Sequence, residues 1–164
     1  MAAPARELVV KVADWAADHG DAAISTLGLG SCVAIMLYDP KSKVGGMAHV
    51  LLPSKSLSRD TSNPAKFPET AVPLLIQRLV ALGGDPRHLV AKLAGGASMF
   101  AQLMTPGSVQ MGERNVVACR AALRAAGIPI AAEAVGGNAG RSVRFVLEDG
   151  RVEIRMVGAD AGVI

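Results

Sequence analysis

One stretch of the chain, residues 26–53, holds the side chains best suited to covalent chemistry. It contains Thr26, Cys32 and His49, separated by a glycine-rich turn and an apolar run. The thiolate of a cysteine is a nucleophile, and an imidazole beside it can take the thiol proton and lower the pKa of the thiol. A threonine can orient that imidazole through its hydroxyl or its carbonyl, the third role in a triad. These residues indicate acyl transfer, with Cys32 as nucleophile, His49 as base and Thr26 as orienting residue.

A hairpin is expected to bring the thiol and the imidazole together. Residues 32–38 and 44–52 are apolar runs, and the turn-forming sequence Asp-Pro-Lys-Ser-Lys lies between them. The first run has the length of a buried strand, although periodicity alone does not distinguish it from the start of a buried helix. If the runs pair around a loop of four or five residues, Cys32 lies opposite His49 or its direct neighbour, with Cβ atoms about 4.5–5.5 Å apart. A slip of one residue would turn the two side chains to opposite faces.

The turn before the cysteine provides donors for an oxyanion. Residues 27–31, Leu-Gly-Leu-Gly-Ser, indicate a flexible turn in which backbone N–H groups can converge on one point. We expect the amides of Ser31 and Cys32 to stabilise the charged oxygen of a tetrahedral intermediate. The turn lacks both the third glycine of a dinucleotide fingerprint and the Gly-Lys of a phosphate loop, which argues against nucleotide binding.

Other interpretations of the same residues were weighed. A cysteine in an apolar run is most often buried and inert, and a histidine beside a strand is usually structural. Zinc is a further candidate because the chain holds three histidines and two cysteines, but their spacing is not that of a zinc site. We therefore expect no metal and no cofactor. Cys119 lies on the apolar face of a predicted helix and is interpreted as core, and His19 and His88 as surface residues.

Composition and charge exclude several classes of protein. A length of 164 residues, of which 51% are hydrophobic, fits one domain with a core of small aliphatic side chains. The net charge is +3 and the basic residues are scattered, which argues against nucleic-acid binding. No stretch has membrane-spanning length and the first residues lack the layout of a secretion signal. With two cysteines and no CxxC motif, one disulfide is arithmetically possible, but the expected compartment is the reducing cytoplasm.

The remaining elements follow from periodicity and turn signals. We expect strands over residues 7–12, 22–26, 88–93, 128–135, 143–147 and 152–157, and helices over residues 68–82 and 112–126. The sequence Glu-Asp-Gly between the last two strands predicts a hairpin. Residues 54–68 form a polar loop of the length at which loops are usually functional or mobile. Mixed elements with hairpins at both ends predict an α+β layered domain with antiparallel pairs over residues 1–164, not a doubly wound parallel sheet.

Ordered motifs along the chain resemble the CheD family of chemoreceptor glutamine deamidases. The matching segments are Leu27–Cys32, Leu37–Pro40, Gly45–His49, Leu52–Pro53, Ala91–Lys92, Gly95–Ala97, Met99–Phe100, Gly112–Asn115, Gly127–Ile128, Gly136–Gly137, Gly140–Arg141 and Phe145. The resemblance extends from about Glu7 to Arg155, and such an ordered series is more specific than any single motif. The chain departs from the family pattern at Ala134, where an acidic residue is frequent, and at Phe67–Thr70, where a Tyr-Val-Asp-like segment is usual.

The resemblance implies a fold and a reaction. The family fold is an α/β/β sandwich of mixed, largely antiparallel sheets with outer helices. The family reaction converts glutamines of methyl-accepting chemoreceptors to glutamates through a cysteine thioester and releases ammonia, and the triad maps onto Cys32, His49 and Thr26. Some members hydrolyse glutamate methyl esters, and many bind the phosphatase CheC. A methylesterase and a regulatory module for a CheC-type phosphatase are therefore the alternative functions. The loop of residues 54–68 is either a contact for receptor helices or a mobile surface loop.

Overall fold

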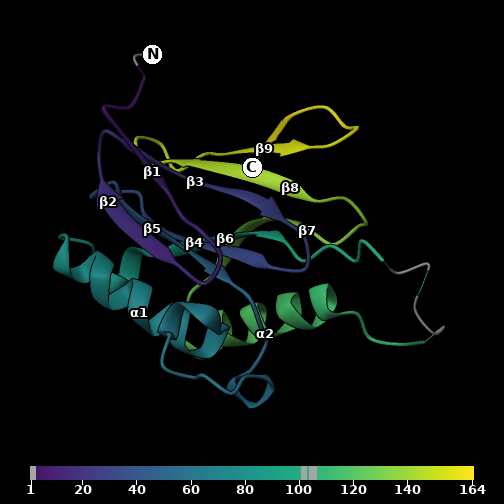
Figure 1. The fold of residues 1–164 in the computed structure, drawn as a ribbon. Helices are drawn as coiled ribbons and strands as arrows, with labels where there is room; N and C mark the ends of the chain where they lie inside the picture. The colour runs from purple at the N-terminus through teal and green to yellow at the C-terminus, as the bar shows by residue number, and fades with distance from the viewer. Residues whose placement is uncertain (1–2, 101–102, 104–106) are drawn as a thin grey trace.

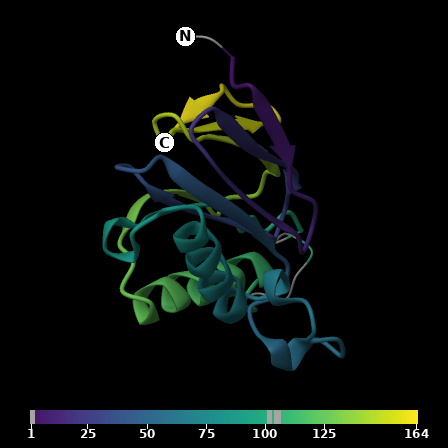
Figure 2. The same ribbon diagram turned by 90° about the vertical axis from the view of Figure 1, so that its left-hand side faces the viewer.

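The computed structural model describes residues 3–100, 103 and 107–164, and its strands form two sheets of five (Figure 1). The elements in chain order are β1 (Arg6–Val9), β2 (Trp15–His19), β3 (Ala22–Leu29), β4 (Val33–Asp39), β5 (Val44–Val50), α1 (Pro68–Ala81), β6 (Val90–Gly95), α2 (Met111–Ala125), β7 (Ile130–Val135), β8 (Arg141–Val146), β9 (Val152–Met156) and β10 (Gly162–Val163). Sheet A has the order β1-β3-β8-β9-β10, and sheet B has the order β2-β5-β4-β6-β7. The sheets stack face to face, and α1 and α2 cover the outer side of sheet B (Figures 1 and 2). The predicted α/β/β sandwich is confirmed.

The sheets are mixed and mostly antiparallel, as expected. Only the pairs β1–β3 and β6–β7 run parallel among the strands described. The β4–β5 and β8–β9 hairpins both form. The helices begin and end within one residue of the predicted bounds.

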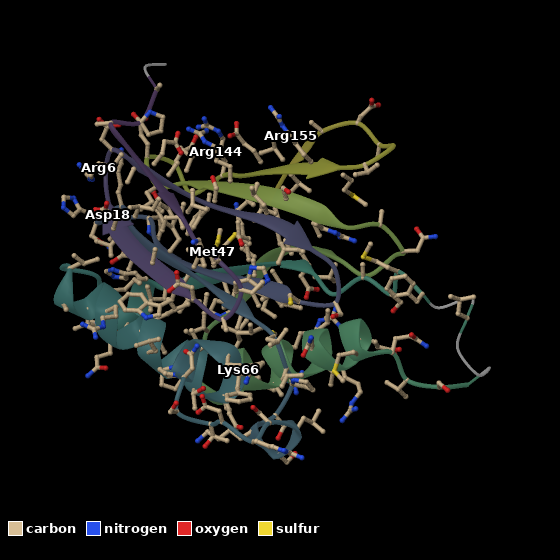
Figure 3. The ribbon with its side chains drawn as sticks, in the orientation of Figure 1. Arg6, Asp18, Met47, Lys66, Arg144 and Arg155 are labelled. Atoms are coloured by element: carbon tan, nitrogen blue, oxygen red, sulfur yellow. The ribbon has the colours of Figure 1, made fainter. Side chains whose placement is uncertain are left out.

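Two apolar cores explain why β4 is apolar from Val33 to Tyr38. One face of β4 packs against the helices through Val33, Ile35 and Leu37, and we call this the helix-side core. The other face packs against sheet A through Ala34, Met36 and Tyr38, which belong to the inter-sheet core. Since β4 is covered on both faces, every one of its residues is buried and the strand needs no polar alternation. Met47 of β5 lies between the two sheets in the same way (Figure 3).

Strand β2 is not predicted by its sequence. Its five residues, Trp-Ala-Ala-Asp-His, do not alternate, and none of them is fully buried. It forms the edge of sheet B, where it pairs only with β5. Asp18 of β2 is 2.9 Å from the guanidinium of Arg6 in β1, so an ion pair joins the two sheets at this edge (Figure 3). The two-residue strand β10 is likewise too short to be recognised in the sequence.

Strand β3 continues further than expected. It extends to Leu29, through the first part of the segment predicted as a turn. The pairing with β8 shifts between Thr26 and Leu29, and Gly28 has a φ of +67° in the gap. The glycine therefore produces a bulge within the strand, a conformation that favours glycine.

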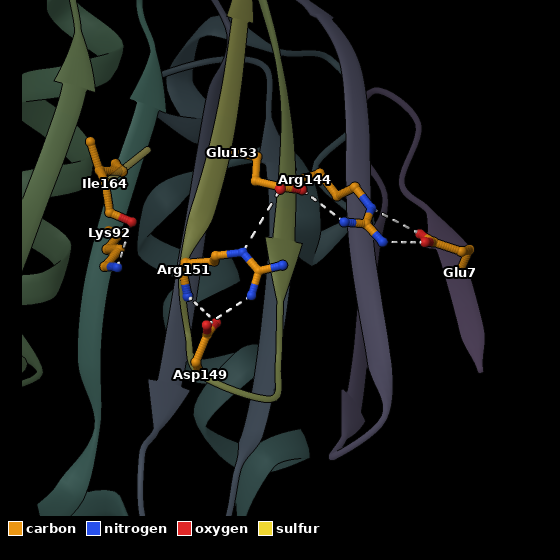
Figure 4. A network of polar contacts seen from close by, with 7 residues as sticks. All are labelled: Glu7, Lys92, Arg144, Asp149, Arg151, Glu153 and Ile164. Carbon is orange, nitrogen blue, oxygen red and sulfur yellow. Dashed lines mark hydrogen bonds and ion pairs between the residues drawn. The ribbon is translucent and has the colours of Figure 1, made fainter. Parts of the chain in front are cut away.

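The outer face of sheet A is polar, and no described helix covers it. Arg144 contacts Glu7 and Glu153, and Arg151 contacts Asp149 and Glu153, in a network that runs from β1 across β3 and β8 to β9 (Figure 4). Such exposed ion pairs contribute little to stability. No helix among the described residues is long and apolar enough to cross a bilayer.

Two glycines offer a matched test of the packing after β6. Gly95 and Gly83 have φ values of +109° and +101°, so alanine is strained at both by about 1–2 kcal/mol. A Cβ at Gly95 would lie 2.3 Å from the carbonyl oxygen of Cys32, whereas one at Gly83 would meet nothing within 4 Å. In urea denaturation, Gly95→Ala should lower the free energy of unfolding by about 1–3 kcal/mol more than Gly83→Ala, the cost of overpacking. Equal losses would show that this turn has room for a side chain.

Candidate active site

The three candidate residues lie near one end of the sandwich and come from both sheets. Cys32 directly precedes β4, and His49 is the last residue but one of β5, so both lie at the same end of sheet B. Thr26 belongs to β3 of sheet A. Thr26 and His49 are buried, and Cys32 is partly exposed. Cys32 is thus the most accessible of the three.

The predicted register of the hairpin is wrong by at least one residue. His49 pairs with Ala34, and continuing this register places Cys32 opposite Leu51. The cause is Asp39, which we assigned to the loop but which pairs with Val44. The carbonyl of Asp39 accepts from the Lys43 amide, and its carboxylate accepts from the Lys41 amide, so the turn closes tightly.

The thiol and the imidazole nevertheless share one face of sheet B. Cys32 lies two residues before Ala34, the partner of His49, and side chains two apart in a strand point the same way. Cys32 also packs against the inter-sheet core. The two residues are therefore diagonal neighbours, a spacing at which side chains can still meet.

A hydrogen bond between the sheets sets the tautomer of His49. The Thr26 hydroxyl oxygen is 2.7 Å from the carbonyl oxygen of Val10 and 2.7 Å from Nδ1 of His49. A carbonyl only accepts, so the single hydroxyl proton is donated to Val10. Nδ1 of His49 must then donate to the Thr26 oxygen, which leaves Nε2 with a free lone pair. This is the tautomer that a base needs if Nε2 is to accept a proton.

The segment that joins β1 to β2 forms hydrogen bonds with both Thr26 and His49. The sequence does not reveal this role. Besides the Val10 carbonyl, the segment provides the Asp14 carbonyl, which accepts from the His49 amide, and the Ala13 amide, which donates to the His49 carbonyl. Ala13 has a φ of +60° at this crossing between sheets. The imidazole is thus held through its ring and through its backbone.

Burial disfavours the charged forms of Cys32 and His49. Burial raises the pKa of the Cys32 thiol and lowers the pKa of the His49 imidazole, because each charged form loses solvation. Nε2 of His49 is buried and makes no hydrogen bond to any described residue, the Cys32 sulfur included. The expected lowering of the thiol pKa by the imidazole is therefore wrong in direction for the resting structure.

The backbone around Cys32 fits the expected oxyanion donors. The Cys32 carbonyl accepts from the Gly96 amide at 2.8 Å, and the Gly30 carbonyl accepts from the Ala97 amide at 2.8 Å. Within the described part of the chain, the amides of Ser31 and Cys32 donate to no carbonyl. The Met99 side chain packs on this turn. A Cβ added to Gly30 would lie 3.0 Å from the Met99 sulfur. The two amides are thus available next to the thiol.

Arg141 supports the loop beside this turn. Its guanidinium donates to the carbonyls of Ala134, Gly136 and Ala139, and Gly136 in turn donates to Gly95. The departure from the family pattern at Ala134 leaves this bond intact, because the acceptor is a main-chain carbonyl. Asn115 of α2 contacts the turn directly through the carbonyl of Ser31 and was likewise not predicted.

The other candidate ligands are dispersed. Cys119 is buried in the helix-side core, His19 is exposed, and both cysteines are free. Within the described residues, no group of three His, Cys, Asp or Glu side chains could hold a metal ion. Three hollows, of about 190, 430 and 320 Å³, lie elsewhere, and none of them is lined by Cys32 or His49. The candidate thiol is therefore partly exposed and does not line any of these hollows.

Comparison with known proteins decides the family. Residues 51–156 match the family model described as CheD chemotactic sensory transduction. This chain belongs to the CheD family. Proteins named "Probable chemoreceptor glutamine deamidase CheD" are similar to it over nearly their whole length. The one from Caldanaerobacter subterraneus subsp. tengcongensis is 43% identical, covering 92% of this chain and 93% of that protein. The one from Methanococcus vannielii is 45% identical, covering 90% and 94%.

The same name is carried by a relative from Pyrococcus abyssi, which is 42% identical over 93% of this chain and 93% of that protein. Among solved structures, the hypothetical protein YfiH from Bacillus licheniformis matches with a TM-score of 0.47 and 14% identity. That match covers 74% of this chain and 49% of the other. Family membership therefore rests on the sequence relatives.

The resting state of the thiol can be tested by alkylation. Because burial raises the pKa of Cys32, the rate of its reaction with iodoacetamide should rise with pH around a midpoint above that of a free thiol, about 8.5. His49→Ala should leave this midpoint nearly unchanged, since burial and not the imidazole sets it. Peptide mapping by mass spectrometry separates Cys32 from the buried Cys119. A midpoint below 8.5 that rises in His49→Ala would instead establish a thiolate–imidazolium pair at rest.

Proposed function

We propose that this protein hydrolyses glutamine side chains of chemoreceptors to glutamates, the activity for which its relatives are named. The observation that carries the proposal is the hydrogen bond between Thr26 and His49, which leaves Nε2 free to act as a base on the face shared with Cys32. A protein that only bound a partner would have no use for such an oriented base beside a partly exposed thiol. The proposed roles are Cys32 as nucleophile, His49 as base and then acid, and Thr26 as positioning residue.

The first half of the reaction forms a thioester. Sγ of Cys32 attacks the side-chain carbonyl carbon of glutamine while Nε2 of His49 takes the thiol proton. The carbonyl oxygen becomes an oxyanion, which the amides of Ser31 and Cys32 stabilise. As the intermediate collapses, the imidazolium returns the proton to the leaving nitrogen and ammonia departs. The product is a γ-glutamyl thioester on Cys32 and a neutral His49.

The second half uses the same groups on water. Nε2 of His49 takes a proton from a water molecule, whose oxygen attacks the thioester carbonyl. The second tetrahedral intermediate expels the Cys32 sulfur, which recovers its proton from His49. The receptor then carries a glutamate, with one more negative charge. No cofactor enters either half.

The pKa values of Cys32 and His49 favour the neutral pair before the reaction. With ordinary pKa values of about 8.5 for a thiol and 6.5 for an imidazole, the ion pair lies about 2.7 kcal/mol above the neutral pair. Burial shifts both groups so that this gap widens. The neutral pair is therefore the state from which proton transfer to His49 starts. Docking of a substrate that brings Sγ to Nε2 would be the step that starts the reaction.

A receptor helix is a large ligand, and the surface around Cys32 fits one. Leu27, Met99 and Phe100 are exposed apolar side chains on segments next to the candidate turn. The loop of residues 54–68 leaves β5 just after His49 and returns where the Lys66 carbonyl accepts from Leu51. This loop stays the candidate for contacting receptor helices.

Three further expectations remain, the first two from the resemblance and the third from the cysteine usage and the layout of the first residues. These are a CheC-type phosphatase as a partner, hydrolysis of receptor glutamate methyl esters, and a cytoplasmic location. An ester would follow the same route, with methanol in place of ammonia as the leaving group. Each stays a prediction for this chain.

Deamidation is measured directly by mass. Incubation with a recombinant cytoplasmic fragment of a chemoreceptor should add about 1 Da at each modified glutamine, because OH replaces NH₂ in the acyl transfer. Cys32→Ala should abolish the gain, and Cys119→Ala should retain it. A mass gain that persists in Cys32→Ala would remove Cys32 from the mechanism.

The role of Thr26 is tested by a pair of substitutions. Thr26→Val keeps the shape but removes the hydroxyl, so His49 loses the acceptor that fixes its tautomer, and kcat should fall about a hundredfold. Thr26→Ser keeps the hydroxyl and should restore most of the activity. Thermal melting shows whether the variants are folded, since an unpaired Val10 carbonyl should cost about 1–3 kcal/mol in Thr26→Val. Equal activity of a folded Thr26→Val and the wild type would contradict the assignment.

A further inference from the structure

One buried side chain joins the two segments that carry the thiol and the imidazole. Asn115 lies in the second turn of α2 and is fully buried. Its amide nitrogen donates to the Ser31 carbonyl at 2.8 Å and to the Leu51 carbonyl at 3.2 Å. Ser31 directly precedes Cys32, and Leu51 follows His49 by two residues. A single NH₂ group on α2 thus bonds to both segments of the candidate active site.

This contact is needed because the ladder of sheet B does not reach Cys32. The pairing of β4 with β5 and β6 begins at Val33. The residues before it are held by separate contacts, one of which is the bond from Gly96 to the Cys32 carbonyl. That bond fixes the peptide plane after Cys32. The bond from Asn115 fixes the peptide plane before it.

The plane before Cys32 contains the predicted oxyanion donor. The Ser31–Cys32 peptide is trans, so the Ser31 carbonyl and the Cys32 amide point in opposite directions. When Asn115 holds the carbonyl toward α2, it aims the Cys32 N–H away from α2. The same hydrogen bond polarises the peptide and makes that N–H a better donor.

We propose that Asn115 is the residue that positions the oxyanion donor of Cys32, an inference that rests on the proposed function. It acts through the Ser31 carbonyl and does not touch the substrate. The residue type fits the task, because one short side chain must present two N–H groups to two carbonyls. Aspartate would oppose both carbonyls with a negative charge, and leucine would fill the space without a donor.

Close packing fixes the position of Asn115 relative to the turn that holds Cys32. A Cβ on Gly112, three residues earlier, would lie 2.4 Å from the Ala97 carbonyl, and a Cβ on Gly96 would lie 2.3 Å from a methyl group of Val116. The helix therefore rests directly on the turn that holds Cys32. The other amide atom of Asn115, Oδ1, is buried and has no partner among the described residues. An unpaired buried acceptor costs stability, so the side chain is not explained by stability alone.

The test distinguishes a loss of oxyanion stabilisation from a misplaced thiol. Asn115→Leu should lower kcat for the receptor fragment about tenfold to a hundredfold with little change in KM, because a misplaced donor weakens only the transition state. Alkylation of Cys32 by iodoacetamide forms no oxyanion, so its rate should stay within about threefold of wild type. Val117→Ala, at an exposed position of the same helix, is the matched control and should leave both rates unchanged. Asn115→Asp should lose activity like Asn115→Leu.

Each outcome decides the inference. A folded Asn115→Leu with wild-type kcat would overturn it, and so would a loss of kcat matched by an equal loss of alkylation, since Asn115 would then position the thiol. If the variants do not fold, hydrogen exchange of the Asn115 side-chain amide in the wild type replaces them. Slow exchange supports the two bonds, and fast exchange overturns them. A wild type that leaves the receptor fragment unchanged would instead contradict the proposed function.

Discussion

The hydrogen bond between Thr26 and His49 is the contact on which the proposed chemistry depends. It crosses the space between the two sheets, so it exists only when sheet A and sheet B are stacked in one relative position. The Thr26 hydroxyl is already committed to the Val10 carbonyl, and this commitment decides which nitrogen of His49 carries the proton. The fold therefore sets the tautomer of His49, through the segment that passes from sheet A to sheet B.

Close packing of glycines fixes the backbone at Cys32, the proposed nucleophile. Cys32 lies just before Val33, the first paired residue of β4, where the backbone of a strand end is normally mobile. Here its carbonyl is held by the turn after β6, and that turn is pressed between Cys32 and α2 with no space for side chains on Gly95, Gly96 or Gly112. The thiol thus remains partly exposed while its backbone is fixed. This combination suits a nucleophile that must meet a large protein substrate at the surface.

Much of the architecture could be predicted because it follows from local signals. The apolar run of β4, the Glu-Asp-Gly hairpin and the periodic face of α2 with Val116, Cys119 and Leu123 all appear as expected. The choice of Cys32, His49 and Thr26 also came from residue types within one short stretch. The prediction that failed, the register of the β4–β5 hairpin, depended on whether Asp39 belonged to the strand or to the loop. Its carboxylate settles this by accepting from the Lys41 and Asp85 amides, and Asp85 is 46 residues away.

What could not be predicted depends on contacts between distant segments. The Val10 carbonyl is main chain and has no signature, and Asn115 lies in a segment that matches the family pattern but does not show which carbonyls it contacts. The pKa directions of Cys32 and His49 depend on burial, which spacing does not show. Residue types thus indicate the candidate groups, but they do not show the direction in which burial shifts the pKa values.

The tautomer of His49 is the most direct test of this account, and nitrogen-15 NMR of the imidazole measures it in the unmodified protein. At neutral pH, we expect a neutral ring with the proton on Nδ1 and a bare Nε2, because Nδ1 donates to Thr26. A ring with its proton on Nε2, or a charged ring with both nitrogens protonated, would contradict the account.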